Sequence, residues 1–364
     1  MAAGAMIPSW WSEAAESLSS SSSAPPIALV CGPANSGKSV FSRHLLDNLL
    51  QRYERVGYLD TDVGQPEFTA PGCQSLHIIH QQTLHPDLTI LCLKTPEKCF
   101  FFGDINCGRD PKTYLKNIFS LYDYFLKQYY QPGQSVVPLV INTSGWVKGI
   151  GYDLLVEMLR YTSPTHVVQI RGPAERKNLP SGMFWLDGNA EGSAKLIEIR
   201  AAQNQSSSQS ARVSIRKDAC ILRELRLIAY FRQCLPRDFN ISSHKELVHS
   251  LASTTPYTIT LSKVKVMHLH CQVSNTETYE GLKSAIIGLA ISSSRPVSPE
   301  HNTPWCVGLG MVRAMDVSKD QLYVVTPIPL RIVEKVDIIL QGLIEIPTCL
   351  LEEQDAPRSR GTSH

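Results

Sequence analysis

Short apolar runs alternate with helical patterns through the first half of the chain. Runs rich in β-branched residues predict strands over residues 27–31, 56–60, 88–94, 136–143 and 165–170. Between several of these runs, apolar residues recur every three or four positions, which predicts helices over residues 40–53, 114–130 and 152–161. Nearly continuous apolar strands that alternate with helices are typical of a mostly parallel α/β sheet with helices on both faces.

The pattern changes in the second half of the chain. A polar, Ser-rich stretch over residues 201–211 predicts a surface insertion, and residues 217–235 predict a long helix. After Pro256, apolar segments separated by turn residues predict an antiparallel, β-rich C-terminal domain with strands within residues 257–273, 322–330 and 342–350. Residues 292–304 predict an exposed loop of this domain.

These patterns divide the chain into four parts. We expect residues 1–26 to be a disordered, Ser- and Pro-rich lead, because a composition of this kind cannot bury a core. The α/β domain covers residues 27–250, the β-rich domain covers residues 251–352, and residues 353–364 form a disordered tail. A length of 364 residues accommodates two domains of ordinary size.

The composition excludes several classes of protein. Hydrophobic residues make up 43% of the chain and charged residues 19%, which is typical of a globular protein and not of a disordered or collagen-like one. Apolar runs stay well short of the ~18 residues that a membrane-spanning helix needs, so we expect no membrane partner. The 10 cysteines form no Cys-x-x-Cys pair, so we expect reduced thiols and neither a zinc site nor a disulfide framework.

The strongest motif is GPANSGKS, which lies directly after a predicted strand and before a predicted helix. Two glycines let the backbone turn tightly, so that successive N–H groups and the helix N-terminus surround phosphate oxygens. We predict that Lys38 reaches the β- and γ-phosphates of a nucleoside triphosphate and that Ser39 holds Mg²⁺. The predicted triphosphate-binding residues are Gly32, Pro33, Ala34, Asn35, Ser36, Gly37, Lys38 and Ser39.

Acidic residues follow the next strand of the same predicted sheet. Asp60 and Asp62 lie where a carboxylate directed at a metal ion belongs, at the carboxyl edge beside the phosphate loop. Asp62 is the candidate for orienting Mg²⁺ and for accepting the proton of an attacking hydroxyl, and Asp60 for sharing the metal or holding Lys38. An ordinary capping or turn role is the alternative for both residues.

Three motifs in this order resemble those of the polynucleotide 5'-hydroxyl kinases. They are the phosphate loop, LDTDVGQPEFTAPG over residues 59–72 and INTSGW over residues 141–146. The segments LRELRLIAYF and GLGMVRAMDVSKDQLYVVTPIP are more similar to the nucleolar pre-ribosomal RNA kinase branch than to the polyadenylation branch. The resemblance covers roughly residues 27–350 and implies a P-loop NTPase-type fold with ATP and Mg²⁺ as cofactors.

The resemblance also implies roles for individual residues. Lys38 and Asp62 match the catalytic residues of the family, and Gln65 in the second motif is assigned to the RNA substrate. Thr143, Gly145 and Trp146 match the clasp that holds the RNA 5' end, and an indole would offer a base a face for stacking. Without the motif, a packing aromatic is the simpler interpretation of Trp146.

Two arginines on the helix over residues 217–235 match the arginine-bearing lid of the family. Arg223 and Arg226 lie three positions apart and therefore share a face, where they would neutralise charge on the transferred phosphoryl group. A solvated basic face, or a lid formed by Arg212 and Arg216, are the alternatives. Although the net charge is only +2, residues 200–245 carry a local charge of +6, which favours a polyanionic substrate.

The function implied by the resemblance is transfer of the ATP γ-phosphate to the 5'-hydroxyl of RNA. For the nucleolar branch this implies processing of the internal transcribed spacer 2 of pre-ribosomal RNA, in the nucleus and nucleolus, with a spacer endonuclease of the Las type as partner. We expect a short form that lacks the family's N-terminal domain, since the phosphate loop begins at Gly32. The alternatives are a P-loop kinase for a nucleoside or other small molecule, and a weakly catalytic ATP-binding scaffold for the endonuclease.

Overall fold

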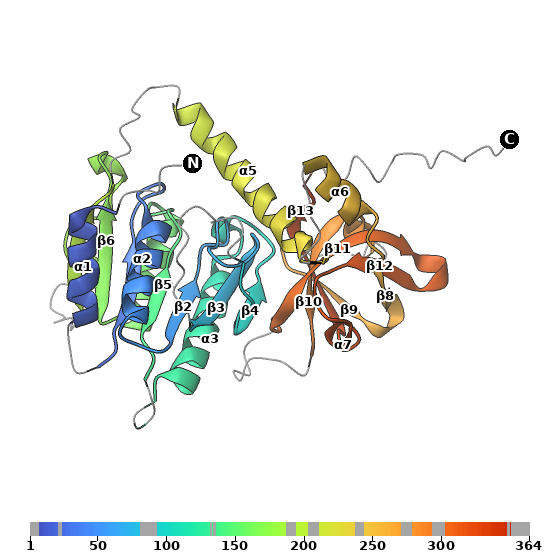
Figure 1. The fold of residues 1–364 in the computed structure, drawn as a ribbon, viewed down its shortest axis with the longest axis horizontal. Helices are drawn as coiled ribbons and strands as arrows, with labels where there is room; N and C mark the ends of the chain where they lie inside the picture. Colours follow the sequence, from blue (N-terminus) through green and yellow to red (C-terminus); the bar gives the residue numbers. More distant parts are fainter. Residues whose placement is uncertain are drawn as a thin grey trace.

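The chain folds into two packed bodies joined by one long helix. In Figure 1 the α/β body and the C-terminal β-rich body lie side by side, and helix α5 (Ala211–Arg232) runs diagonally between them. The computed structural model describes residues 7–20, 24–80, 93–131, 133, 136–186, 194–202, 211–236, 244–270, 279–292, 303–347 and 350. Most of the predicted strand over residues 88–94, both predicted surface loops and the tail lie largely or wholly outside these ranges.

The first body contains a seven-stranded sheet with the strand order β4-β3-β2-β5-β1-β6-β7. Strands β2, β5, β1, β6 and β7 are parallel, and β3 is antiparallel to both of its neighbours. The strands are β1 (Ile27–Cys31), β2 (Val56–Asp60), β3 (Cys73–Ile79), β4 (Lys98–Phe101), β5 (Leu139–Asn142), β6 (His166–Arg171) and β7 (Lys195–Arg200). Because the five parallel strands point the same way, the residues that follow them share one edge of the sheet.

Helices cover both faces of this sheet, as the apolar strand pattern predicts. Alternate residues of β1 point to opposite faces, so that Leu29 joins one apolar core and Val30 the other. Helices α3 (Pro111–Tyr129) and α4 (Ile150–Thr162) bury their apolar residues in the first core. Helices α1 (Ser9–Ser20) and α2 (Lys38–Leu50) bury theirs in the second and lie in front of the sheet in Figure 1. The predicted mostly parallel α/β fold is confirmed.

Helix α1 corrects the prediction that residues 1–26 form a disordered lead, which is wrong for residues 9–20. Trp11, Ala15 and Leu18 are buried against α2 and the sheet. These residues follow the three-to-four spacing of an amphipathic helix. The free energy gained by burying their apolar side chains stabilises the helix even though the neighbouring sequence is rich in serine. Backbone contacts hold both ends, because the Trp11 indole donates to Arg200 O at 2.8 Å and Arg52 donates to Ser19 O at 3.0 Å.

The packing of α1 can be tested at Leu18. Replacing this fully buried residue with alanine is expected to lower the free energy of unfolding by about 2–5 kcal/mol, because it removes buried methyl groups and leaves a cavity. Glu13→Ala on the exposed face of the same helix should change it by less than about 0.5 kcal/mol. Denaturant unfolding of the full chain measures both values, and equal values for the two variants would contradict the packing of α1.

The second body contains a six-stranded sheet with the order β8-β12-β11-β10-β13-β9. Its neighbouring strands are antiparallel except for β13 and β9, which are parallel. The strands are β8 (Tyr257–Thr260), β9 (Lys265–His268), β10 (Ala285–Ala290), β11 (Cys306–Asp316), β12 (Gln321–Val325) and β13 (Ile338–Glu345), with a short helix α7 (Leu330–Val333) before β13. The predicted β-rich C-terminal domain is confirmed.

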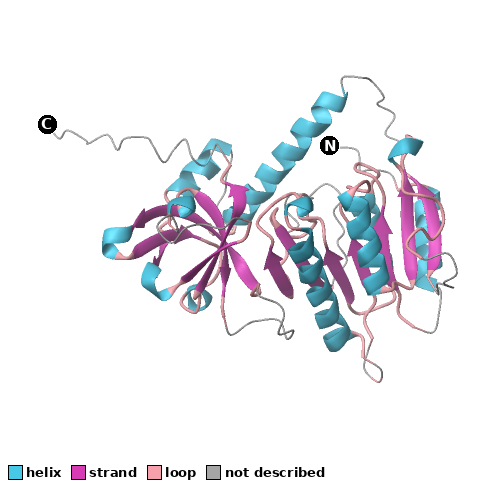
Figure 2. Ribbon diagram, turned by 180° about the vertical axis from the view of Figure 1, so that it is seen from behind, coloured by secondary structure: helices cyan, strands magenta, loops and turns pink. Residues whose placement is uncertain are grey.

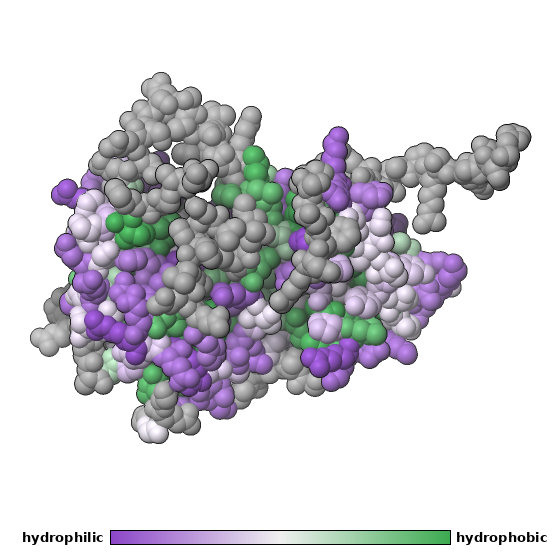
Figure 3. Space-filling view, viewed as in Figure 1, coloured by the Kyte–Doolittle hydropathy of each residue, from purple (hydrophilic) through white to green (hydrophobic). Residues whose placement is uncertain are grey.

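The core of this second body takes in residues that we placed in the first domain. Leu227 and Phe231 at the end of α5, and Val248 of α6 (His244–Ala252), pack into one apolar cluster with residues of β10 and β11. The same cluster includes Phe101 at the end of β4, so it spans both bodies. The space-filling view in Figure 3 shows apolar surface over the middle of α5, where the helix passes between them.

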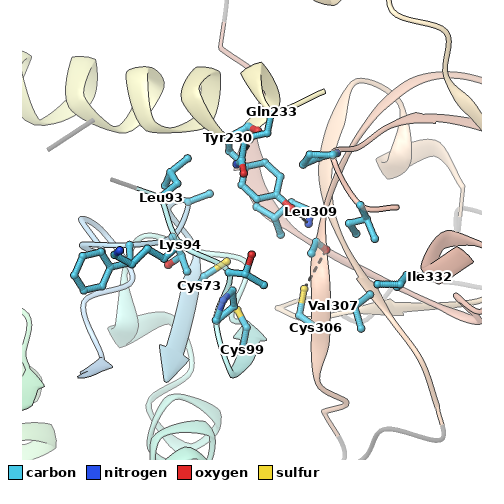
Figure 4. Close-up of a pocket in the computed structure, with 18 of the residues that line it drawn as sticks. Cys73, Leu93, Lys94, Cys99, Tyr230, Gln233, Cys306, Val307, Leu309 and Ile332 are labelled. Carbon is cyan, nitrogen blue, oxygen red and sulfur yellow. Dashed lines mark hydrogen bonds between the residues drawn. The ribbon is translucent and has the colours of Figure 1, made fainter. Parts of the chain in front are cut away.

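A cavity of about 280 Å³ lies where the two bodies meet. Figure 4 shows that Cys73 and Cys99 line it from the first body, Cys306 from the second and Tyr230 from α5. The Tyr230 hydroxyl accepts a hydrogen bond from Leu309 N at 2.7 Å, which ties α5 to β11. Helix α5 is therefore anchored in the C-terminal sheet, and Figure 2 shows from behind the same continuous path of the helix between the bodies.

Within the described ranges, no helix has the combination of length and apolar character required to cross a bilayer. Long helices such as α3 are amphipathic, with buried residues on one face only.

Candidate nucleotide and acceptor site

The phosphate loop joins β1 to α2 at the carboxyl edge of the sheet. Gly32 and Gly37 adopt φ angles of +152° and +92°, which favour glycine. A Cβ on Gly32 would lie 2.4 Å from Ile170 O, and one on Gly37 would lie 2.6 Å from the Trp11 ring. Only glycine fits at these two positions, so the close packing of β6 and α1 accounts for both glycines of the motif.

The polar side chains of the loop are arranged to receive an anion. Lys38 is buried, and its Nζ donates to Pro33 O at 3.0 Å, so the ammonium group folds back over the loop. Burial lowers the pKa of Lys38, and the nearby charge of Asp62 opposes that shift. Ser36 Oγ is buried and has no hydrogen-bond partner among the described residues. This unpartnered hydroxyl and the first turn of α2, where Ser39 is half-buried, suit phosphate oxygens.

Asp60 forms part of the framework beneath the site. Its Oδ1 accepts hydrogen bonds from Asp62 N at 3.2 Å and from Asn142 Nδ2 at 3.1 Å, and its Oδ2 accepts from Glu67 N at 2.5 Å. Burial raises the pKa of this carboxyl to about 7, although the hydrogen bonds favour its charged form. Because both oxygens already accept hydrogen bonds, this geometry favours a structural role for Asp60, and its contact with a metal ion or with Lys38 stays a prediction.

Asp62 has one oxygen that is available for chemistry. Its Oδ1 accepts hydrogen bonds from Gly64 N at 3.0 Å and from Gln65 N at 3.1 Å, which fixes the carboxylate in a turn. Among the described residues, no hydrogen bond or ion pair is found at Oδ2 of Asp62. Since Mg²⁺ uses one or two carboxylates together with substrate phosphates, Asp62 and Ser39 supply oxygen donors that fit this ion.

The third motif places its members differently around the loop. The Thr143 hydroxyl is buried and donates to Val30 O at 2.8 Å, so its proton is committed to β1. A Cβ on Gly145 would lie 2.6 Å from Ala34 Cα, which explains why glycine follows Ser144 there. Trp146 is 40% exposed, and its ring lies against Gly108. Of the three predicted clasp residues, Trp146 offers the surface that a substrate can reach.

A neighbouring loop over residues 104–109 lies beside Trp146 and the loop after β2, and it was not found from the sequence. The Arg109 guanidinium donates to Asp104 Oδ2 at 2.9 Å, and a Cβ on Gly64 would lie 3.2 Å from Ile105 O. Gln65, assigned to RNA by the resemblance, is half-buried on the loop facing this segment. Residues 104–109 lack a recognisable motif, so only the packing of the segment between β4 and α3 against the loop after β2 places them here.

The two predicted lid arginines have different surroundings. Arg226 is buried, and its Nη1 donates to Glu67 O at 2.6 Å, while Arg223 is half-buried three residues earlier on α5. Glu67 itself is buried and pairs with Arg43 of α2, with 3.2 Å between Arg43 Nε and Glu67 Oε1. Burial raises the pKa of Glu67, and the two arginines oppose that shift. The side chains of Arg212 and Arg216 lie outside the described residues.

Comparison with known families covers both bodies of the chain. Residues 32–233 match the family described as the mRNA cleavage and polyadenylation factor CLP1 P-loop, and residues 252–347 match the NOL9-like C-terminal domain. A protein of Arabidopsis thaliana described as polynucleotide 5'-hydroxyl-kinase NOL9 is 53% identical over 351 residues, covering 96% of this chain and 94% of that protein. The chain belongs to the polynucleotide 5'-hydroxyl kinase family. The membership expected from the three ordered motifs is confirmed.

Other members of the kinase family are longer. Polynucleotide 5'-hydroxyl-kinase NOL9 of Danio rerio is 31% identical, and the alignment covers 90% of this chain and 47% of that protein. The Homo sapiens NOL9 protein is 29% identical, with 90% of this chain and 50% of that protein covered. This kinase-family chain therefore spans about half the length of its animal relatives. The solved structure of a Clp1p–Pcf11p complex has the same fold, with a TM-score of 0.63 at 16% identity, covering 93% of this chain and 79% of that one.

Proposed function

We propose that this chain transfers the γ-phosphoryl group of ATP to the 5'-hydroxyl end of RNA. One observation carries the proposal: the phosphate-binding loop, Asp62 with its available oxygen and the exposed Trp146 follow β1, β2 and β5, which are neighbouring parallel strands, so all three meet at one edge of the sheet. This edge brings together what a phosphoryl transfer to a nucleic-acid end requires: a site for the phosphate donor, an activating carboxylate and a base-stacking surface. Membership of the family supports the reaction type.

Binding of ATP begins at the phosphate loop. The backbone N–H groups from Gly32 to Gly37 and the N-terminus of α2 would surround the phosphates, and Ser36 Oγ would gain a partner. Lys38 would exchange its bond to Pro33 O for the β- and γ-phosphates. Ser39 would hold Mg²⁺ and Asp62 would orient it through bound water, which leaves Oδ2 of Asp62 to accept a proton; the ion would neutralise charge on the phosphate oxygens.

Asp62 then acts on the acceptor. Its turn to Gly64 and Gln65 holds the carboxylate in one orientation, so that Oδ2 can accept the proton of the RNA 5'-hydroxyl. Attack by that hydroxyl on the γ-phosphorus breaks the bond to the β-phosphate oxygen and releases ADP. The half-buried Arg223 would approach the γ-phosphate from α5, whereas Arg226 keeps α5 on the catalytic loop through Glu67.

Phosphorylation of defined acceptors tests the proposal. The purified chain is incubated with γ-labelled ATP and either an RNA with a 5'-hydroxyl, the same RNA with a 5'-phosphate, a matching DNA, or free nucleosides. Label on the 5'-hydroxyl RNA and not on its 5'-phosphorylated control is the expected result. Label on nucleosides alone would replace the proposal with a small-molecule kinase, and ATP binding without any transfer would replace it with a scaffold.

Trp146 gives a separate test of the acceptor side. Replacing it with alanine removes a stacking face worth ~1–3 kcal/mol, so the KM for RNA should rise about 5- to 150-fold while the KM for ATP stays nearly constant. Steady-state kinetics against each substrate measures the two constants. Trp146→Phe should retain part of the RNA affinity, and an unchanged KM for RNA in Trp146→Ala would exclude the stacking role.

The names of the relatives support a proposal for the cellular setting. Because NOL9 proteins are among them, we propose that the RNA is a pre-ribosomal spacer end produced by an endonuclease of the Las type, in the nucleolus. The basic residues 200–245 support a polyanionic substrate. Co-purification of the endonuclease with this chain, and accumulation of 5'-hydroxyl spacer RNA when the chain is depleted, are the expected observations.

A further inference from the structure

The reaction geometry fixes where the nucleoside part of ATP must go. In an in-line transfer the leaving ADP lies opposite the attacking hydroxyl. Asp62 and Trp146 place the hydroxyl beside β2 and β5, on one side of the phosphate loop. The base and ribose therefore extend to the other side, over the ends of β6 and β7.

Two segments form that side of the site. The first is the loop after β6, where Gly172 approaches Pro33 and Asn178 accepts a hydrogen bond from Gly172 N at 2.8 Å. The second is the end of β7, where Arg200 O accepts hydrogen bonds from two adjacent indoles of α1. Helix α1 runs beside α2 in Figure 1, and Trp11 against Gly37 shows that its first turn lies at the phosphate loop.

The two indoles of this first turn have different surroundings. Trp11 is 1% exposed and stacks edge-on with Phe41, with 5.6 Å between ring centroids, so it belongs to the core. Trp10 is 47% exposed, and its Nε1 donates to Arg200 O at 3.2 Å. The hydrogen bond fixes the polar edge of Trp10 to the strand end, while half of the side chain stays open to solvent. Because Trp10 is so exposed, its ring contributes little to the packing of the core.

We infer that Trp10 is the stacking surface for the adenine base of the nucleotide held by the phosphate loop. The inference rests on the proposed use of ATP, and it identifies the residue that contacts the adenine base. An indole face gives a base ~1–3 kcal/mol of stacking, and the hydrogen bond to Arg200 O orders the ring before the nucleotide arrives. Because every base has a π face, Trp10 favours a nucleotide over a bare polyphosphate and discriminates weakly between bases.

Binding measurements without RNA test this role. Titration calorimetry with ATP and with inorganic tripolyphosphate compares the wild-type chain, Trp10→Ala, Trp10→Phe and the acceptor-side control Trp146→Ala. We expect Trp10→Ala to weaken ATP binding about tenfold and to leave tripolyphosphate binding unchanged, while Trp10→Phe retains most of the ATP affinity and Trp146→Ala matches the wild type.

Three results would overturn the inference. The first is an ATP affinity of Trp10→Ala equal to that of the wild type. The second is a loss of affinity in Trp10→Ala that is equal for ATP and tripolyphosphate. The third is a wild-type chain that binds ATP no more tightly than tripolyphosphate. Failure of the proposed RNA kinase activity is a separate result, because these titrations contain no RNA. Thermal unfolding of each variant shows whether α1 remains packed.

Discussion

Lys38→Ala is expected to lower kcat for RNA phosphorylation by about 10²–10³-fold. The buried ammonium group lies 3.0 Å from Pro33 O, within the loop that would enclose the phosphates. A preorganised positive charge stabilises the negative charge that develops in the transition state, and this contributes much of the rate enhancement. Removing one such group lowers kcat by about 10²–10³-fold. Single-turnover assays with labelled ATP and 5'-hydroxyl RNA measure the effect.

A matched control removes the same charge elsewhere. Lys127 is exposed near the end of α3, at the opposite edge of the sheet from the phosphate loop, and Lys127→Ala should keep kcat within about twofold of the wild type. If Lys38→Ala retained full activity, the phosphate loop would not be the site of transfer, and the proposed reaction would have to be placed elsewhere in the chain.

Asp62→Asn is expected to lower kcat by about 10²–10⁴-fold, with little change in stability. Asparagine retains a carbonyl oxygen that can accept from Gly64 N and Gln65 N, so the turn is preserved. What is lost is the negative charge and the base that takes the proton of the RNA 5'-hydroxyl, a contribution of that size in general-base catalysis. Presteady-state kinetics at saturating RNA reports this step.

Asp60 provides the contrast for this prediction. Its two oxygens hold Asn142, Asp62 N and Glu67 N, so a substitution there should act on folding as well as on rate. Thermal unfolding therefore separates the two aspartates. A large loss of stability in Asp62→Asn, or a kcat within threefold of the wild type, would contradict the assignment of Asp62 to chemistry.

The strands whose sequences are mostly apolar could be predicted from the sequence, whereas β3, which buries several polar residues, could not. Residues 27–31 and 56–60 are strands with the predicted bounds, because mostly apolar side chains fill both faces of the sheet there. Strand β3 was missed because Gln74 and His77 interrupt its pattern. The fold satisfies these groups, since Gln74 donates to Tyr114 O at 3.1 Å and accepts from Asn117 at 2.8 Å. A strand of this kind forms only because residues distant in the sequence supply hydrogen-bond partners for its buried polar side chains.

The same distinction applies to the site. The phosphate loop and Asp62 are local patterns, in which the spacing of a few neighbouring residues dictates the chemistry. The contact of Arg226 with Glu67 joins residues 159 positions apart, and the contact of Trp10 with Arg200 joins residues 190 apart. No local spacing encodes these pairs, so the contact of α5 with the loop after β2, and the position of α1 beside the phosphate loop, required the three-dimensional fold.

Helix α5 belongs to one module by sequence and packs partly with the other module in space. The two family matches end and begin on either side of residues 234–251, yet Leu227 and Phe231 before that point pack with the sheet that follows it. The boundary between modules in the sequence therefore differs from the boundary in space. A chimera joined at that junction would separate an apolar helix face from the strands that cover it, so we expect such a chimera to be less stable than the parent chain.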